Sequence, residues 1–185
     1  IAFFLFLLPF GWIKATASSH PESFPWKAQW INTERCQSAT NTWLIYRKSF
    51  GVTDVPNQLI ARIAADSKYW LWINDQLGGL KRGPSPSGTY YDPVDIAPYL
   101  TKGTNTIAVL LWHFGKDGFS HINSGKAALL FEAIAPGLEI VSDASWQCAL
   151  YEAYQNTEAP FPNYRMPESN IRFDARQAIP NWNRT

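Results

Sequence analysis

The chain has 185 residues, a formal net charge of +1 and 17% charged residues. This balance argues against a nucleic-acid-binding surface, which needs clustered Lys and Arg side chains. With 46% hydrophobic residues, the chain can bury a core and is not of the disordered class. Its nine Trp, eight Tyr and eleven Phe residues suit either a large β-sheet core or the stacking of sugar rings.

An almost wholly apolar segment, residues 1–13, opens the chain. It is shorter than the ~20 residues that span a bilayer, and Ala15-Thr16-Ala17 after it match a small-x-small cleavage site. We therefore expect residues 1–17 to be the remnant of a secretory signal peptide, the alternative being a buried hydrophobic strand. The protein would then be secreted or periplasmic, with no membrane attachment after cleavage. In such an oxidising compartment Cys36 and Cys148 could pair or remain two thiols, and their spacing leaves both open.

Runs of apolar and β-branched residues, separated by Gly- and Pro-rich turns, follow from Trp26 onward. The expected strands are residues 42–50, 59–65, 69–74, 104–114, 127–134, 138–141 and 145–150. Residues 95–100 predict one short turn of helix, with Asp95 as its cap. Short strands at regular spacing are typical of a β-sandwich or jelly roll. We therefore predict an all-β domain in residues 18–158, followed in residues 159–185 by a peripheral wrap or linker.

Side-chain alternation along two of these strands indicates how they are covered, because neighbouring residues of a strand face opposite ways. Both faces of residues 104–114 are largely apolar, which predicts a central strand covered on both sides. Trp70 and Trp72 share one face of their strand and form either a packing layer or a sugar platform. At the entry to the long strand, Gly103 is expected to have a positive φ and Asn105 to bond nearby backbone.

The acidic residues form no motif of a glycosidase active site, which needs two carboxyl groups facing each other across a cleft. We therefore expect no catalytic residue in this chain. The three histidines have no zinc-ligand spacing. No cofactor or structural metal is expected, although calcium, which takes oxygen ligands, could bind in a loop with Asp92 or Asp117.

The most distinctive segment is residues 112–121, WHFGKDGFSH, which leaves a strong strand and enters a loop with two glycines. Its rings and its Lys-Asp pair offer the stacking and charge-assisted hydrogen bonds that a sugar ring requires. The alternative is a crossover loop that packs on itself. The residues expected at a sugar-binding site are Trp112, Phe114, Lys116, Asp117, His121, Tyr91 and Asp92.

A set of motifs resembles the N-terminal domain of bacterial α-L-rhamnosidases of glycoside hydrolase family 78. The motifs are DSKYWLWIN (66–74), GLKRGP (79–84), TYYD (89–92), VDIAPYL (94–100) and GTNTIAV (103–109). Their order also resembles the galactose-binding-like jelly roll of many other glycosidases. Residues 114–121 and 167–176 are similar to the rhamnosidase group in particular.

The resemblance implies a non-catalytic, carbohydrate-binding-like domain of a secreted enzyme that hydrolyses terminal rhamnosides. In that family the catalytic residues lie in a downstream α-helical barrel, which this chain lacks. The implied partners are a rhamnose-containing glycan and the downstream catalytic domain. The alternatives are a purely structural domain that docks on the barrel, and an enzyme in its own right. Relatives are expected to have several more residues between Leu77 and Gly78, and a Gly at the position of Asp75, which predicts a shortened hairpin here.

Overall fold

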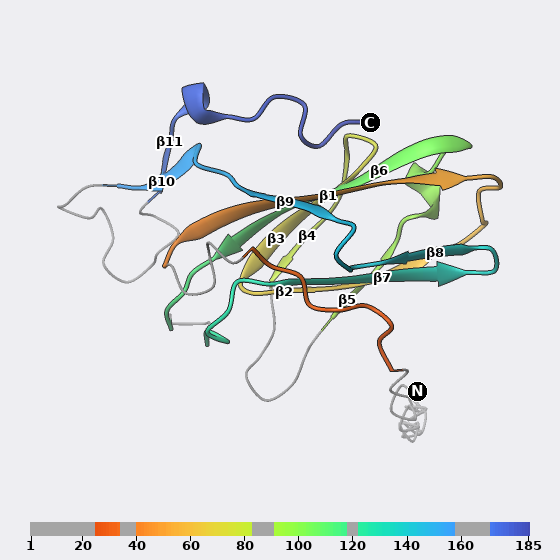
Figure 1. Ribbon diagram of the computed structural model, residues 1–185, viewed down its shortest axis with the longest axis horizontal. Helices are drawn as coiled ribbons and strands as arrows, with labels where there is room; N and C mark the ends of the chain where they lie inside the picture. Colours follow the sequence, from red (N-terminus) through yellow and green to blue (C-terminus); the bar gives the residue numbers. More distant parts are fainter. Residues whose placement is uncertain (1–24, 34–39, 83–90, 118–121, 158–170) are drawn as a thin grey trace, which may run out of the picture.

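Two antiparallel β-sheets lie face to face in the computed structural model (Figure 1), which describes residues 25–33, 40–82, 91–117, 122–157 and 171–185. In spatial order, the five-stranded sheet consists of β4 (Gln76–Arg82), β3 (Lys68–Ile73), β6 (Gly103–His113), β1 (Thr42–Val52) and β9 (Gln147–Leu150). The four-stranded sheet consists of β5 (Asp92–Asp95), β2 (Ile60–Ala65), β7 (Leu129–Ala135) and β8 (Leu138–Val141). The predicted all-β sandwich is confirmed.

Every strand expected from the sequence is present, with small shifts at its ends. Strand β4 was expected only as the second arm of a shortened hairpin, and neither β5 nor a separate two-stranded sheet of β10 (Tyr154–Asn156) and β11 (Ile171–Phe173) was expected. Within the described residues there are also two short 3-10 helices, η2 (Ala97–Tyr99) and η4 (Ala175–Gln177). No helix within the described ranges is both long enough and apolar enough to cross a membrane.

The main core fills the space between the two sheets. Tyr69, Leu71 and Ile73 of β3 point into it and are fully buried, whereas Trp70 and Trp72 lie half-buried on the outer face. Strand β6 is buried on both faces, as its sequence predicted. Each large apolar side chain in this core contributes roughly 1.5–3 kcal/mol of stability.

Asp95 fixes the short helical turn that follows β5. Its Oδ1 accepts hydrogen bonds from the backbone N–H of Ala97 at 3.1 Å and of Leu59 at 3.0 Å. Ile96 is the N-cap residue of η2, and Asp95 is the residue before it. The Asp95 carboxylate therefore caps the first turn of η2 and ties it to the start of β2. The predicted turn is confirmed, and Asp95 bonds its first N–H group as expected, although the N-cap position itself is taken by Ile96.

The entry to β6 is built around Gly103 and Asn105. Gly103 has a φ of +95°, which L side chains rarely adopt. The Nδ2 of Asn105 donates to the carbonyls of Thr101 at 2.7 Å and Gly103 at 3.0 Å, and its Oδ1 accepts from the Thr101 N–H at 2.8 Å. Both predictions for this turn are confirmed.

We expect Gly103→Val to lower the free energy of unfolding by about 1–3 kcal/mol, because valine is strained at this φ. A Cβ at Gly103 would meet no heavy atom within 4 Å, so the cost comes from the backbone and not from a clash. Gly51→Val is the matched control, since Gly51 lies opposite Thr104 in β1, has equal space and no positive φ. Urea denaturation measures both, and equal midpoints would contradict the argument.

The β3–β4 hairpin closes through the two residues Asn74 and Asp75. Their φ values of +50° and +66° suit a tight two-residue hairpin turn, and Asn and Asp tolerate this conformation better than most residues. Strand β4 pairs along the whole of β3, with an irregularity opposite Leu71 and Trp72 that accommodates Gly78. The tight turn leaves β4 paired along the whole of β3, and the expectation that relatives have a longer hairpin stays a prediction.

The last residues of the chain cross the outer side of the five-stranded sheet (Figure 1). Strand β11 pairs with β10, and the indole of Trp182 lies edge-on to that of Trp72 at 5.1 Å between ring centroids. Residues 171–185 are the described part of the expected wrap. The expected signal peptide, residues 1–17, lies outside the described residues, as does Cys36, so the pairing of Cys148 stays open.

Candidate functional site

The loop expected to bind sugar is tied to the sandwich by the buried Asp66 carboxylate. Its Oδ1 accepts from the Ser67 hydroxyl at 2.6 Å, and its Oδ2 accepts from the backbone N–H of Ser124 at 2.8 Å and from the Ser124 hydroxyl. Ser67 Oγ in turn accepts from the Phe114 N–H at 3.1 Å. Both ends of the loop, at Phe114 and Ser124, are therefore held by two adjacent residues.

The environment of Asp66 favours its ionised form. Burial alone would raise the pKa of this carboxyl, but His113, with Nδ1 3.6 Å from Oδ1, and the hydrogen bonds from Ser124 and Ser67 hold the pKa well below its usual range. A buried carboxylate that is ionised and hydrogen-bonded in this way is a structural clamp.

Trp112 and Phe114, the two rings expected to form a sugar wall, are each only 3% exposed. They lie edge to face, with centroids 4.7 Å apart. The ammonium group of Lys68 lies 5.5 Å from the centroid of each ring, within cation–π range. As they stand, these rings support the loop from beneath and present no open face to a ligand.

Lys116 and Asp117 are exposed on the first part of the loop. Asp117 Oδ1 accepts from the backbone N–H of Asn123 at 2.9 Å, so this side chain helps to close the loop. His121 lies outside the described residues. Of the loop residues expected at the site, Lys116 and Asp117 are thus the ones that the structure shows at the surface.

Tyr91 and Asp92 make their contacts elsewhere in the sandwich. Asp92 Oδ2 accepts from the Tyr69 hydroxyl at 2.8 Å, and burial, together with this carboxylate, raises the pKa of Tyr69. Tyr91 is 39% exposed and lies edge-on to Trp26, beside the guanidinium of Arg62. Within the described part of the chain, no three His, Cys, Asp or Glu side chains form a metal-binding group. Calcium at Asp92 or Asp117 stays a prediction.

Other acidic side chains also serve local structure. Glu132 pairs with Arg62 and accepts from the backbone N–H groups of Lys27 and Ala28 at 2.6 and 3.0 Å. Burial raises the pKa of this carboxyl, but these partners outweigh it and the pKa is lowered. Asp174 caps η4 and pairs with Arg176 at 2.7 Å. The Glu132 carboxylate thus holds the segment around Lys27 and Ala28 against the sheet, and the Asp174 carboxylate holds the turn at η4.

Sequence reasoning missed a stack of aromatic rings on the outer face of the five-stranded sheet. Trp43 lies at its centre, with ring centroids of Trp112, Tyr154 and Trp70 at 4.5, 4.1 and 5.6 Å and nearly parallel planes. Trp43 stands directly opposite Trp112 in the pairing of β1 with β6. Of the two alternatives for the strand-borne Trp side chains, the structure shows the packing layer.

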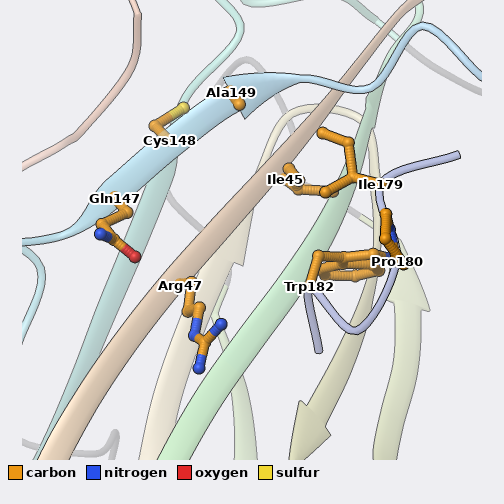
Figure 2. Close-up of a pocket in the computed structure, with 8 residues that line it drawn as sticks. All are labelled: Ile45, Arg47, Gln147, Cys148, Ala149, Ile179, Pro180 and Trp182. Carbon is orange, nitrogen blue, oxygen red and sulfur yellow. The ribbon is translucent and has the colours of Figure 1, made fainter. Parts of the chain in front are cut away.

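Beside this stack, a cavity of about 250 Å³ lies between the sheet and the last residues of the chain (Figure 2). Its lining residues are Ile45, Arg47, Gln147, Cys148, Ala149, Ile179, Pro180 and Trp182. Arg47 and Gln147 stand directly opposite each other on β1 and β9. The polar lining residues Arg47 and Gln147 thus lie on the sheet, whereas the tail contributes only Ile179, Pro180 and Trp182. No signal in the sequence indicated the cavity, because its two sides come from segments far apart in the chain.

No protein-family model matches the chain, and no curated protein does. Among solved structures, a family 78 rhamnosidase of Bacillus sp. GL1 matches with a TM-score of 0.75 and 30% identity, over 86% of this chain and 17% of that one. An α-L-rhamnosidase from Dictyoglumus thermophilum matches with a TM-score of 0.65 and 21% identity, over 86% of this chain and 19% of that one. The α-L-rhamnosidase from Aspergillus terreus matches with a TM-score of 0.64 and 22% identity, over 86% of this chain and 20% of that one.

The second and third of these structures show the shared fold alone, whereas the first also carries sequence similarity. The chain spans only 17–20% of the length of the three rhamnosidases. The match therefore concerns one domain and not a whole enzyme. The resemblance that the motifs indicated is confirmed: over 86% of its length, the chain is similar to one part of a family 78 rhamnosidase, with 30% identity.

Proposed function

We propose that the chain is a non-catalytic, carbohydrate-binding domain of a secreted α-L-rhamnosidase. The similarity to the Bacillus rhamnosidase over 86% of this chain carries the proposal. Since the chain covers 17% of that enzyme, we assign hydrolysis of terminal rhamnosides to another part of the full-length protein, a downstream catalytic domain. Secretion would depend on the signal segment at residues 1–17.

The site that we propose for a rhamnose-containing glycan is the loop from Phe114 to Ser124. Loops held by a rigid β-scaffold are common binding elements, and the Asp66 clamp gives this loop such a support. Lys116 and Asp117 are exposed on it and provide a donor and an acceptor for sugar hydroxyls. In this arrangement the buried rings of Trp112 and Phe114 support the loop and do not stack on the sugar.

We expect Asp117→Ala to weaken the binding of rhamnose roughly ten- to hundredfold, the usual effect of removing a charged hydrogen-bond partner. Oδ1 of Asp117 accepts from Asn123 N–H, and Oδ2 is then the oxygen that would accept from a sugar hydroxyl. Calorimetric titration of rhamnose measures the change, and circular dichroism checks the fold. Glu139→Ala, which removes an exposed carboxylate paired with Lys27, is the control. Equal affinity in wild type and Asp117→Ala would remove this loop from the site.

A purely structural role is the second candidate. It is favoured by the outer aromatic layer, which packs on itself and under the tail, and by the exposed apolar side chains of Phe173 and Ile179, at 51% and 40% exposure. On this view the domain docks on the catalytic domain of the same chain. A wild-type protein that folds but binds no rhamnose-containing glycan would favour this role over the first.

A further inference from the structure

The cavity beside the aromatic stack follows from the pairing of the strands under it. The pairing of β9, β1, β6 and β3 places outward-facing residues in rows across the sheet. One row is Ala149, Ile45, Leu110 and Trp70, and the next is Gln147, Arg47, Ala108 and Trp72. The small side chain of Ala149 leaves space above the sheet, and Ile179, Pro180 and Trp182 of the tail cover part of it (Figure 2).

Arg47 brings an uncompensated charge to this cavity. Its side chain is half-buried, yet its guanidinium has neither a hydrogen bond nor an ion pair with any residue that the structure describes. None of the eight lining residues is acidic. A guanidinium offers a planar fork of donors that matches a carboxylate with two parallel hydrogen bonds. Among the described residues that line the cavity, none supplies the anionic partner that the Arg47 guanidinium is suited to bind.

The remaining lining residues suit a polyhydroxylated ring. The Gln147 amide stands beside Arg47 and can both donate to and accept from hydroxyl groups. Trp182, Ile179 and Ile45 form an apolar side that can cover the C–H face of a pyranose. Pockets for drug-sized ligands measure about 300–1,000 Å³, so a cavity of about 250 Å³ suits a single sugar unit.

We propose that this cavity is a binding site for a hexuronate, a sugar ring that carries a carboxylate. Arg47 binds the carboxylate, Gln147 binds a ring hydroxyl, and the indole of Trp182 covers the ring. This site goes beyond the proposed rhamnose site in its ligand, residues and position. Thr42 of β1 stands opposite His113, where β6 ends and the rhamnose loop begins. Arg47 lies five residues further along β1, so the two sites are roughly 17 Å apart at about 3.4 Å per residue.

The test is calorimetric titration of sodium D-glucuronate into the whole chain and into Arg47→Gln. We expect the wild type to bind and Arg47→Gln to bind roughly ten- to hundredfold more weakly. Arg172→Gln is the matched control and should bind as the wild type does, because its guanidinium is exposed and bonds Gln155 on the separate two-stranded sheet. Ala149→Phe, which fills the cavity from the sheet and leaves Arg47 in place, should also abolish binding.

Two further ligands separate the parts of the proposal. D-glucose provides the ring without the carboxylate, and acetate provides the carboxylate without the ring, so both should bind at least about tenfold more weakly than glucuronate. No binding by the wild type, or equal affinity in Arg47→Gln, would overturn the proposal. Acetate binding as tightly as glucuronate would reduce the cavity to a plain anion site. Rhamnose binding and its loss in Asp117→Ala are independent of all these outcomes.

Discussion

Replacing Trp43 with alanine is expected to lower the free energy of unfolding by about 3–5 kcal/mol, the range found for large aromatic side chains removed from a packed layer. The indole is only 4% exposed and is stacked against Trp112, Tyr154 and Trp70. Its removal leaves a cavity between the rings of Trp112 and Tyr154. Urea denaturation followed by circular dichroism measures the change.

The matched control is Trp30→Ala, because Trp30 is 45% exposed and its loss should change stability by at most about 0.5 kcal/mol. A second consequence distinguishes the stack from an isolated buried ring. Tyr154 contacts Trp43 and pairs with Phe173 of β11, so loss of the indole should speed amide exchange in residues 171–185. Similar stability losses in the two variants, with unchanged exchange in the tail, would show that the stack does not hold the outer layer together.

The strands of the sandwich could be predicted because their signals are local. In β6, apolar residues on both faces indicated a central strand, and the structure places it between β3 and β1. Gly103 and Asn105 could be assigned for the same reason, since a positive φ and a backbone-bonding amide act within a few residues. The bounds of β4 could not be predicted because two glycines interrupt its pattern, and β5, β10 and β11 were missed because they are very short.

What covers each sheet face could not be predicted in the same way. Alternation placed Trp112 and Phe114 on one face of their strand, but it carried no information on the segment above them. That cover comes from Trp43 on another strand and from Lys68, and the two rings share one hydrophobic cluster with Trp182 of the tail. The loop was therefore identified by its composition, whereas the burial of its rings follows from long-range packing.

Long-range packing also explains why the roles of Asp66 and Arg47 could not be predicted from the sequence. Asp66 was one of several acidic residues with no diagnostic motif, and its role depends on Ser124, which lies in a different loop. Arg47 stands in a strand whose alternation is ordinary, and its position opposite Gln147 depends on the register of β1 with β9. Register and chain crossing are decided by the whole fold, so single-sequence patterns cannot specify such pairs.

Asp66→Ala is expected to lower the free energy of unfolding by about 3–5 kcal/mol, because several buried donors lose their shared acceptor, at about 1–3 kcal/mol each. The variant leaves the N–H and hydroxyl of Ser124 and the hydroxyl of Ser67 without their acceptor. The control is Asp54→Ala, because Asp54 pairs with Lys102 at 2.8 Å with both side chains largely exposed. Such a surface pair contributes at most about 1 kcal/mol.

The effect of Asp66 on stability should also depend on pH with a definite sign. The pKa of this carboxyl is lowered in the folded protein from the ordinary value of 3.8, so its contribution is fully present above that value and is lost as the pH falls towards the lower, folded pKa. The difference in unfolding free energy between wild type and Asp66→Ala should therefore be constant from about pH 7 to pH 5 and shrink below about pH 4. Urea denaturation at each pH measures this difference. A difference that stayed unchanged in acid would mean that the carboxylate stabilises the loop by its shape and not by its charge.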